Sequence, residues 1–158
     1  MEGKTCIIPG SFDPMTIGHL SIIAKASKFF DNVVVAILNN SDKVGFLTLA
    51  ERKEIAEKTC EGLKNVNVIT ADGLLVDIAK SLNISHIVKG LRNTIDFEYE
   101  QNMAKINKAL EPNIQTIYIP CDPEFDIISS SFVRELYRHN KKIEMYVHPC
   151  AVEIIESK

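Results

Sequence analysis

The sequence predicts an α/β protein built on a doubly wound, five-stranded parallel sheet. Short runs rich in β-branched residues alternate with segments of helical periodicity, as in βαβ units. One of these runs, residues 33–38, is almost entirely apolar, which is typical of a strand covered on both faces. The 158 residues contain no repeat, low-complexity tract or linker, so we expect a single domain over residues 1–158.

The expected elements follow one another in a regular alternation. Strands are expected over residues 5–9, 33–38, 65–70, 86–88 and 115–119. The first helix should begin near Gly18, because apolar residues then recur on one helical face. A second should begin at Thr48, which has capping-box spacing to Glu51. Further helices are expected over residues 73–82 and 95–110, from within residues 129–131, and after Pro149.

The composition excludes several classes of protein. Hydrophobic residues make up 46% and charged residues 25%, so the chain is neither disordered nor collagen-like. The net charge of −3 argues against nucleic-acid binding, and the basic run at residues 138–142 is expected to be a solvated helix end. No apolar run approaches the ~20 residues of a membrane helix. The four cysteines lie far apart, so we expect free thiols. No secretory leader is recognisable, so we expect a cytoplasmic protein without membrane contact.

The segments that follow the expected strands carry the candidate functional residues. In an open α/β sheet, ligands bind beyond the carboxyl ends of the strands, where the strand order reverses. The segments at that end are residues 10–19, 39–43, 72–75, 89–92 and 126–131, and they are rich in glycines, hydroxyls and cations. We therefore expect these groups to converge on one rim of the sheet and to bind a small phosphorylated substrate.

Residues 10–19 are the most informative of these segments. Gly10 lets the backbone approach a phosphate closely. Gly18 and His19 fall at a helix N-terminus, where free N–H groups and the helix dipole favour anions. The same residues equally fit a turn around Asp13 and Pro14 with a helix-capping role, and the residues alone leave both interpretations open.

The order of the motifs resembles that of the nucleotidyltransferase superfamily. The string Gly-Ser-Phe-Asp-Pro that begins at Gly10 and leads to Gly18-His19 is similar to its first signature, and Ile-Ser-Ser-Ser-Phe-Val-Arg at residues 128–134 is similar to its second. Between them, Lys-Gly-Leu-Arg at 89–92 and Asp-Phe-Glu-Tyr-Glu at 96–100 resemble one branch, the bacterial phosphopantetheine adenylyltransferases. The resemblance covers nearly the whole chain and implies a Rossmann-like nucleotidyltransferase fold.

The resemblance also implies a reaction. Members of that branch transfer the adenylyl group of ATP to 4'-phosphopantetheine, which yields dephospho-coenzyme A and pyrophosphate in coenzyme A biosynthesis. Mg²⁺ is then expected as cofactor, bound mainly through the ATP phosphates with no protein metal ligand, and no covalent enzyme intermediate forms. The family likeness further implies a homohexamer.

Roles for single residues follow from the same resemblance. His19 would stabilise the transition state at the α-phosphate, Lys43 would hold the attacking phosphate, and Arg92 would meet the ATP phosphates. Besides His19 and Arg92, the ATP site would comprise Gly10, Ser11, Phe12, Gly90, Leu91, Glu100, Phe125, Asp126, Ile127, Ile128, Ser129, Ser130 and Ser131. The phosphopantetheine site would comprise Ser11, Lys43, Leu75 and Lys89.

Several of these residues also have a plain structural interpretation. Lys89 departs from the arginine common in the family, and lysine keeps the charge but loses the bidentate fork. Glu100 also fits a solvated acidic face shared with Asp96 and Tyr99, and Leu75 also fits the core. The remaining histidines are expected to be structural or solvent-facing: His86, His139 and His148.

Two alternative functions remain. A sister enzyme, such as a nicotinate mononucleotide adenylyltransferase or a cytidylyltransferase, would share residues 10–19 but would not need Lys43 or the turn at residues 89–92. A non-catalytic nucleotide or coenzyme A sensor would bind without a donor at the α-phosphate, which His19 supplies.

Overall fold

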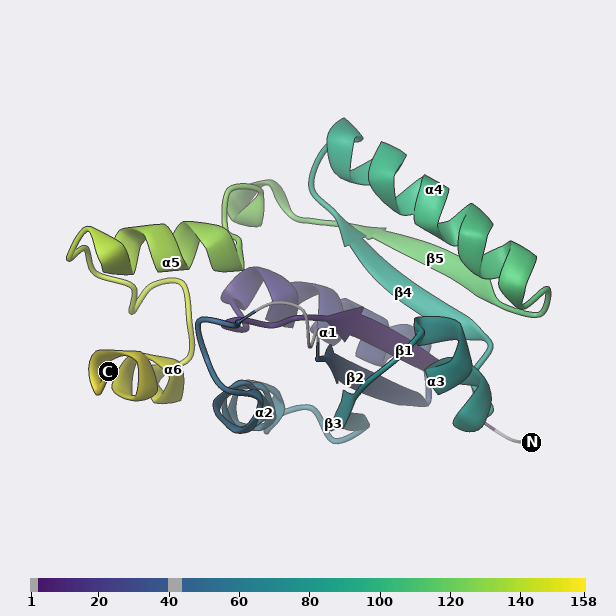
Figure 1. Cartoon of the computed structure of the whole chain (residues 1–158), viewed down its shortest axis with the longest axis horizontal. Coiled ribbons are helices and arrows are strands. Elements are labelled where there is room, and N and C mark those ends of the chain that lie inside the picture. Colours follow the sequence, from purple (N-terminus) through teal and green to yellow (C-terminus); the bar gives the residue numbers. More distant parts are fainter. Residues whose placement is uncertain (1–2, 40–43) are drawn as a thin grey trace.

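Five parallel strands form the centre of the molecule in the order β3-β2-β1-β4-β5 (Figure 1). The computed structural model describes residues 3–39 and 44–158. The strands are β1 (Thr5–Gly10), β2 (Asn32–Leu38), β3 (Val66–Ala71), β4 (His86–Leu91) and β5 (Gln115–Pro120). The chain runs outward from β1 to β3 and then returns to the other side of β1, so the strand order reverses between β1 and β4. The predicted doubly wound parallel sheet is confirmed.

Four helices connect successive strands, and two more follow the last strand. They are α1 (Ile17–Phe29), α2 (Leu49–Cys60), α3 (Leu75–Ser81), α4 (Thr94–Leu110), α5 (Ser130–Arg138) and α6 (Pro149–Glu156), with a short 3₁₀ turn at Pro123–Phe125. The helix expected from Thr48 has the predicted capping box: the Thr48 hydroxyl accepts the Glu51 N–H, and the Glu51 carboxylate accepts the Thr48 N–H. No helix in the described ranges is long and apolar enough to cross a membrane.

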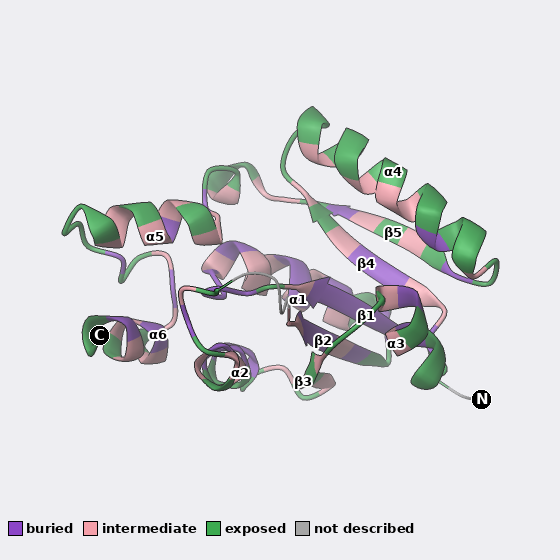
Figure 2. Cartoon of the chain, in the orientation of Figure 1, coloured by how far each residue is buried: buried purple, intermediate pink, exposed green. Residues whose placement is uncertain are grey.

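The central strands are largely buried (Figure 2). Their alternate residues enter two separate cores, one on each face of the sheet. On β1, Cys6 and Ile8 point to one face and Ile7 to the other. The first face packs against α1, α2, α5 and α6, and the second packs mainly against α3. Burial on both faces explains why β1 and β2 have nearly continuous apolar sequences.

Several element boundaries differ from the expected ones, most of them by one residue, and three of the differences have a clear physical reason. Helix α1 begins at Ile17, because the side chain of Thr16 caps it. Helix α3 begins two residues later than expected, since Gly73 has φ +98° and cannot be helical. Strand β4 continues three residues beyond the predicted end, as Lys89 and Gly90 still pair with β5. The last difference matters most, because it carries Lys89 along the sheet toward the rim.

Candidate active site

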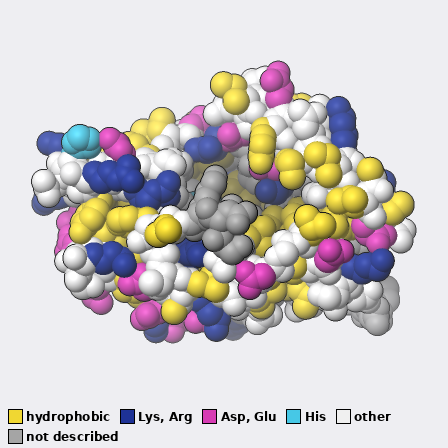
Figure 3. Space-filling view, in the orientation of Figure 1, with side chains coloured by type: hydrophobic (Ala, Val, Ile, Leu, Met, Phe, Trp, Pro, Cys, Tyr) yellow, Lys and Arg dark blue, Asp and Glu magenta, His cyan; other side chains and the backbone are white. Residues whose placement is uncertain are grey.

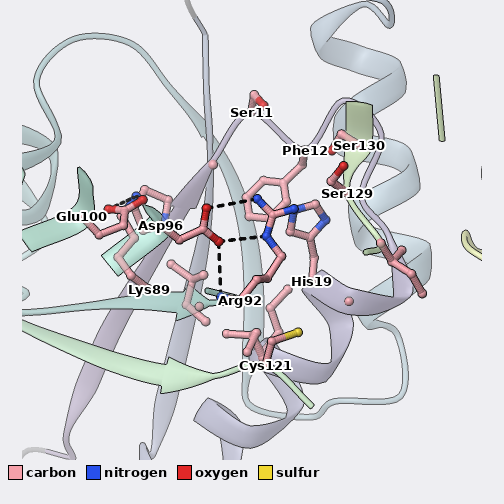
Figure 4. A pocket seen from close by; sticks show the side chains of 18 of the residues that line it. Ser11, Phe12, His19, Lys89, Arg92, Asp96, Glu100, Cys121, Ser129 and Ser130 are labelled. Carbon is pink, nitrogen blue, oxygen red and sulfur yellow. Dashed lines mark hydrogen bonds and ion pairs between the residues drawn. The ribbon is translucent and has the colours of Figure 1, made fainter. Parts of the chain in front are cut away.

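A cavity of about 390 Å³ lies at the carboxyl ends of β1 and β4, where the strand order reverses. The segments that follow β1, β4 and β5 all contribute to its wall (Figure 4). Twelve of the predicted site residues line it: Gly10, Ser11, Phe12, His19, Lys89, Gly90, Arg92, Glu100, Ile128, Ser129, Ser130 and Ser131. Residues far apart in the sequence therefore meet in one pocket at the expected end of the sheet.

His19 is fixed in one orientation by the start of α1. It occupies the third helical position, and its Nδ1 accepts the backbone N–H of Thr16 at 2.9 Å. Its own backbone N–H donates to the Thr16 hydroxyl at 3.3 Å, which completes a capping box in which histidine replaces the usual Glu or Gln. Because Nδ1 is an acceptor, the proton of the neutral ring lies on Nε2, which leaves Nε2–H as the free donor.

The surroundings of His19 keep the ring neutral. Burial, and then the nearby positive charge of Arg92, lower its pKa from 6.5 to about 4. Figure 4 shows the Arg92 guanidinium between the imidazole of His19 and the carboxylate of Asp96. The ring of Phe12 packs edge-on against the imidazole, with the ring centroids 5.1 Å apart. The site thus presents a rigid, uncharged N–H donor beside a cation.

Two ion pairs line the α4 side of the pocket. Lys89 Nζ lies 3.3 Å from both carboxylate oxygens of Glu100. Arg92 Nε donates to Asp96 Oδ2 at 2.9 Å, and Arg92 Nη2 donates to Asp96 Oδ1 at 3.3 Å. Asp96 and Glu100 are one helical turn apart on α4, so they share a face, as predicted. Tyr99 is exposed and does not line the cavity.

The three serines at the start of α5 have different partners. Ser129 caps the helix by accepting the Phe132 N–H at 3.0 Å. Ser130 donates to the Pro14 carbonyl at 2.8 Å, and Ser131 accepts from Arg134 at 3.0 Å. The α5 N-terminus is thus joined to the loop after β1, and the pocket contains the N-termini of two helices, α1 and α5. Both helix dipoles favour an anion there.

Five predicted residues do not line the cavity. A sixth, Lys43, falls outside the described residues. Leu75 packs against the core cluster on the α3 face of the sheet, which agrees with its structural interpretation. Four others are not among the residues that line the cavity: Leu91, Phe125, Asp126 and Ile127. Ile127 is 70% exposed.

Two histidines and one aspartate have structural partners. His148 caps α6 by accepting the Cys150 N–H, and His139 lies 2.9 Å from Glu135 on the exposed end of α5. The carboxylate of Asp13 accepts the N–H groups of Phe46 and Leu47 at 2.8 Å each. Asp13 therefore anchors the segment before α2 to the loop after β1.

The pocket also contains residues that the sequence interpretation gave no role. Ile22 and Cys121 line the wall, and Asp96 holds Arg92. Cys121 directly follows β5, so inspection of the first residue after each strand would have found it. Burial and the carboxylates of Asp126 and Asp122 raise the pKa of the Cys121 thiol, and the nearby cations Lys25 and Arg92 offset only part of this rise. The thiol is therefore neutral in this environment.

This arrangement suits the binding of a polyanion more than the binding of a metal by side chains alone. No group of three or more potential metal ligands from His, Cys, Asp and Glu occurs in residues 3–39 and 44–158. The pocket instead offers helix N-termini, a neutral imidazole N–H, and two cations whose carboxylate partners could be exchanged for phosphate oxygens. Such groups stabilise negative charge that develops on a phosphoryl group.

Comparisons with known proteins agree with this chemistry. Residues 7–136 match the family model described as Cytidylyltransferase-like. The chain is 43% identical over 141 residues to a phosphopantetheine adenylyltransferase of Clostridium botulinum, with 89% of each chain covered. It is 42% identical over 158 residues to that of Streptococcus uberis, with 99% of this chain and 95% of the relative covered.

A solved structure supports the fold. The crystal structure of a Vibrio parahaemolyticus protein, provisionally described as a nicotinate-nucleotide adenylyltransferase, matches with a TM-score of 0.72. The match covers 98% of this chain and 92% of that protein at 20% identity. At this identity, the likeness concerns the architecture alone.

Proposed function

Because the chain belongs to the phosphopantetheine adenylyltransferase family, we propose that its pocket transfers the adenylyl group of ATP to 4'-phosphopantetheine, giving dephospho-coenzyme A and pyrophosphate. The enzyme is thus a nucleotidyltransferase of coenzyme A biosynthesis. The observation that carries the assignment is the oriented Nε2–H of His19, beside Arg92, in a pocket with two helix N-termini.

Catalysis of this reaction depends mainly on the positioning of the two substrates and on the stabilisation of negative charge at the α-phosphate. A phosphate oxygen of 4'-phosphopantetheine attacks the α-phosphorus of ATP, the bond to the β-phosphate oxygen breaks, and pyrophosphate departs in line. Negative charge grows on the oxygens around phosphorus, so a donor held in place before the reaction lowers the barrier. We assign this task to His19, whose Nδ1 is already engaged by Thr16 and whose Nε2–H is free to donate.

The two ion pairs support a role for Lys89 and Arg92 in anion binding. Each cation has a carboxylate partner in the free protein, and phosphate oxygens can take over those contacts without new ordering of the side chains. Arg92 then contacts the ATP phosphates, and Lys89 contacts phosphopantetheine. Glu100 keeps Lys89 in place, and its backbone carbonyl accepts the Tyr118 hydroxyl at 3.2 Å, which ties α4 to β5.

The remaining roles rest on the family resemblance with partial support from geometry. The pocket-lining positions of Ser11, Phe12 and Ser129 to Ser131 support contacts with ATP phosphates. Lys43, as the cation for the attacking phosphate, and Leu75, as a contact of the pantetheine arm, are proposals from the resemblance alone. The placing of Leu91 and residues 125–127 at the adenine side of the ATP site is likewise a proposal from the resemblance alone.

We further propose that Mg²⁺ accompanies ATP. The pocket carboxylates Asp96 and Glu100 are paired with cations, and Asp13 is engaged by two backbone N–H groups. Mg²⁺ readily takes substrate phosphates and waters as its ligands. When bound, Mg²⁺ would neutralise charge on the triphosphate, while His19 and Arg92 act on the α-phosphate and its neighbours.

We also propose that the chain self-associates, as a hexamer by family resemblance, in the cytoplasm. Figure 3 shows hydrophobic side chains gathered over the part of the surface that α4 occupies. On α4, Ile95, Tyr99, Ile106 and Leu110 are 51–78% exposed. Such apolar surface is typical of an interface. Sedimentation at micromolar concentration measures the stoichiometry, and a monomer would contradict the hexamer.

The cytoplasmic location has separate support. All four cysteines are free thiols, which supports a reducing compartment.

The decisive assay offers ATP with different acceptors. We expect pyrophosphate release when the acceptor is 4'-phosphopantetheine and negligible release when it is nicotinate mononucleotide. Release should also be negligible when ATP and the acceptor are both replaced by the substrates of a cytidylyltransferase. Turnover of nicotinate mononucleotide but not of 4'-phosphopantetheine would overturn the substrate assignment. Nucleotide binding without turnover of any acceptor would favour a sensor.

A further inference from the structure

Arg52 is a buried charge that the mechanism above does not use. Its side chain lies on α2 and is only 7% exposed. It makes no ion pair with any carboxylate in the described part of the chain, and its Nε has no hydrogen-bond acceptor there. Burying a guanidinium that finds no carboxylate partner in these residues is costly, so we expect its contacts there to serve a purpose.

In the described residues, the only side-chain hydrogen bonds of Arg52 go to two backbone carbonyls at the functional rim. Its Nη1 donates to the Ser11 carbonyl at 3.0 Å and approaches the Leu38 carbonyl at 3.4 Å. Ser11 directly follows β1, and Leu38 ends the neighbouring strand β2. Arg52 itself is not part of the pocket wall, whereas Ser11 and Phe12 are. The guanidinium therefore contacts the backbone of a pocket-lining residue without lining the pocket itself.

The contact fixes the plane of the Ser11–Phe12 peptide. In a trans peptide, the carbonyl and the N–H point in opposite directions. A Ser11 carbonyl held toward Arg52 therefore turns the Phe12 N–H away from Arg52. Because Ser11 and Phe12 line the cavity and Arg52 does not, we infer that this N–H faces the cavity. The Phe12 N–H has no acceptor within residues 3–39 and 44–158, so it is available to a ligand.

The backbone at Phe12 shows that this orientation is not the relaxed one. Phe12 has φ +46°, in the left-handed region that a bulky side chain rarely adopts. Its ring is locked between Gly10 and His19, with only 3% exposed. A rotation of the Ser11–Phe12 peptide by about half a turn would relieve φ, but it would aim a carbonyl oxygen at the bound phosphates. A charge-assisted hydrogen bond is strong enough to oppose that rotation.

We propose that Arg52 is a positioning residue, which holds the Ser11–Phe12 peptide so that the Phe12 N–H donates to a phosphate oxygen of the nucleotide. This inference rests on the proposed adenylyl transfer for its kinetic test, but its binding test needs only a phosphate ligand. It explains by one cause two features of residues 3–39 and 44–158: a buried arginine that pairs with no carboxylate there, and a strained phenylalanine.

The kinetic test compares Arg52→Met, Arg52→Lys and a matched control. Arg52→Met keeps the volume and removes the donors, so kcat should fall about tenfold to a hundredfold, with the KM for ATP changed less than about threefold. Arg52→Lys keeps a charged donor and should recover much of the loss. The control is Lys53→Met, the next residue on α2, whose exposed ammonium pairs with Glu57 at 3.2 Å. It loses the same charge and should keep kcat within about twofold.

The binding test uses inorganic pyrophosphate and the amide resonance of Phe12 in ¹⁵N-labelled protein. In the wild type, the Phe12 amide proton should shift downfield in a saturable manner as pyrophosphate is added. In Arg52→Lys the shift should persist, and in Arg52→Met it should fall below half. If Arg52→Met does not fold, a wild-type Phe12 amide that fails to respond still overturns the inference, and Arg52→Lys still tests whether a charged donor at position 52 supports the response.

The outcomes separate this inference from the proposed function. A wild-type Phe12 amide that does not respond to pyrophosphate would overturn the inference, and so would an equal response in wild type and Arg52→Met. A wild-type protein that shows the shift but turns over no acceptor would overturn the proposed reaction and leave the peptide orientation supported.

Discussion

Protonation of His19 is the perturbation whose size follows most directly from the geometry. Nδ1 accepts the Thr16 N–H at 2.9 Å, and burial and Arg92 lower the pKa to about 4. At pH 6, a ring with this pKa is about 99% neutral, whereas an unperturbed histidine is only about 24% neutral. The free enzyme should therefore keep its Nε2–H donor, as a neutral ring, throughout the range in which ordinary histidines become charged.

The same shift makes stability depend on pH in a defined direction. The folded protein binds fewer protons at His19 than the unfolded chain does, so this contribution is complete above about pH 6.5 and is lost as the pH falls through 6.5 toward 4. A pKa lowered from 6.5 to about 4 corresponds to at most about 3.4 kcal/mol, and solvent in the open pocket reduces this to about 1–3 kcal/mol.

Ring ¹⁵N chemical shifts measured across pH 3.5–8 test this account. We expect His19 to show the Nε2–H tautomer and to titrate near pH 4. Urea denaturation at pH 7 and pH 4.5 should show a smaller difference in unfolding free energy for His19→Gln than for the wild type. Titration near pH 6.5, or a proton on Nδ1, would refute the capping geometry on which the catalytic role depends.

Three further changes have expected outcomes. Asp96→Asn removes the charge that orients Arg92, so kcat/KM for ATP should fall about threefold to tenfold in steady-state kinetics, and an unchanged value would exclude Asp96 as the holder of Arg92. Gly90→Ala brings a Cβ to 2.9 Å from the Ile22 side chain, so we expect a loss of about 1–3 kcal/mol in chemical denaturation, and wild-type stability would show that Ile22 can move aside. Chelation of divalent cations should abolish pyrophosphate release without changing the circular dichroism melting curve, and persistent turnover in the chelator would contradict the magnesium proposal.

The fold was predictable because its signals are local. Apolar runs marked the strands, and the Thr48–Glu51 spacing marked the start of α2. The start of α1 was missed by one residue. Thr16 caps the helix, but its capping-box partner three residues later is His19 and not the usual Glu or Gln. The end of β4 was missed because Lys89 and Gly90 look like a turn, although backbone pairing with β5 extends the strand through them.

The pocket was predictable in outline and not in its internal contacts. The rule that ligands bind at the carboxyl ends of parallel strands pointed to residues 10–19 and 89–92. No local pattern reveals that Arg92 pairs with Asp96, or that Arg52 reaches the Ser11 carbonyl across 41 residues of sequence. Those contacts depend on how far β4 extends and on how α2 packs against β2, which only the tertiary structure determines.

The measurement that tests the central claim most directly is a crystal structure of the protein with dephospho-coenzyme A. The account predicts that the phosphate joined to the adenosine lies within hydrogen-bond distance of His19 Nε2, with Arg92 turned toward the phosphates. A product bound elsewhere, or an imidazole of residue 19 that faces away from the phosphorus, would contradict it.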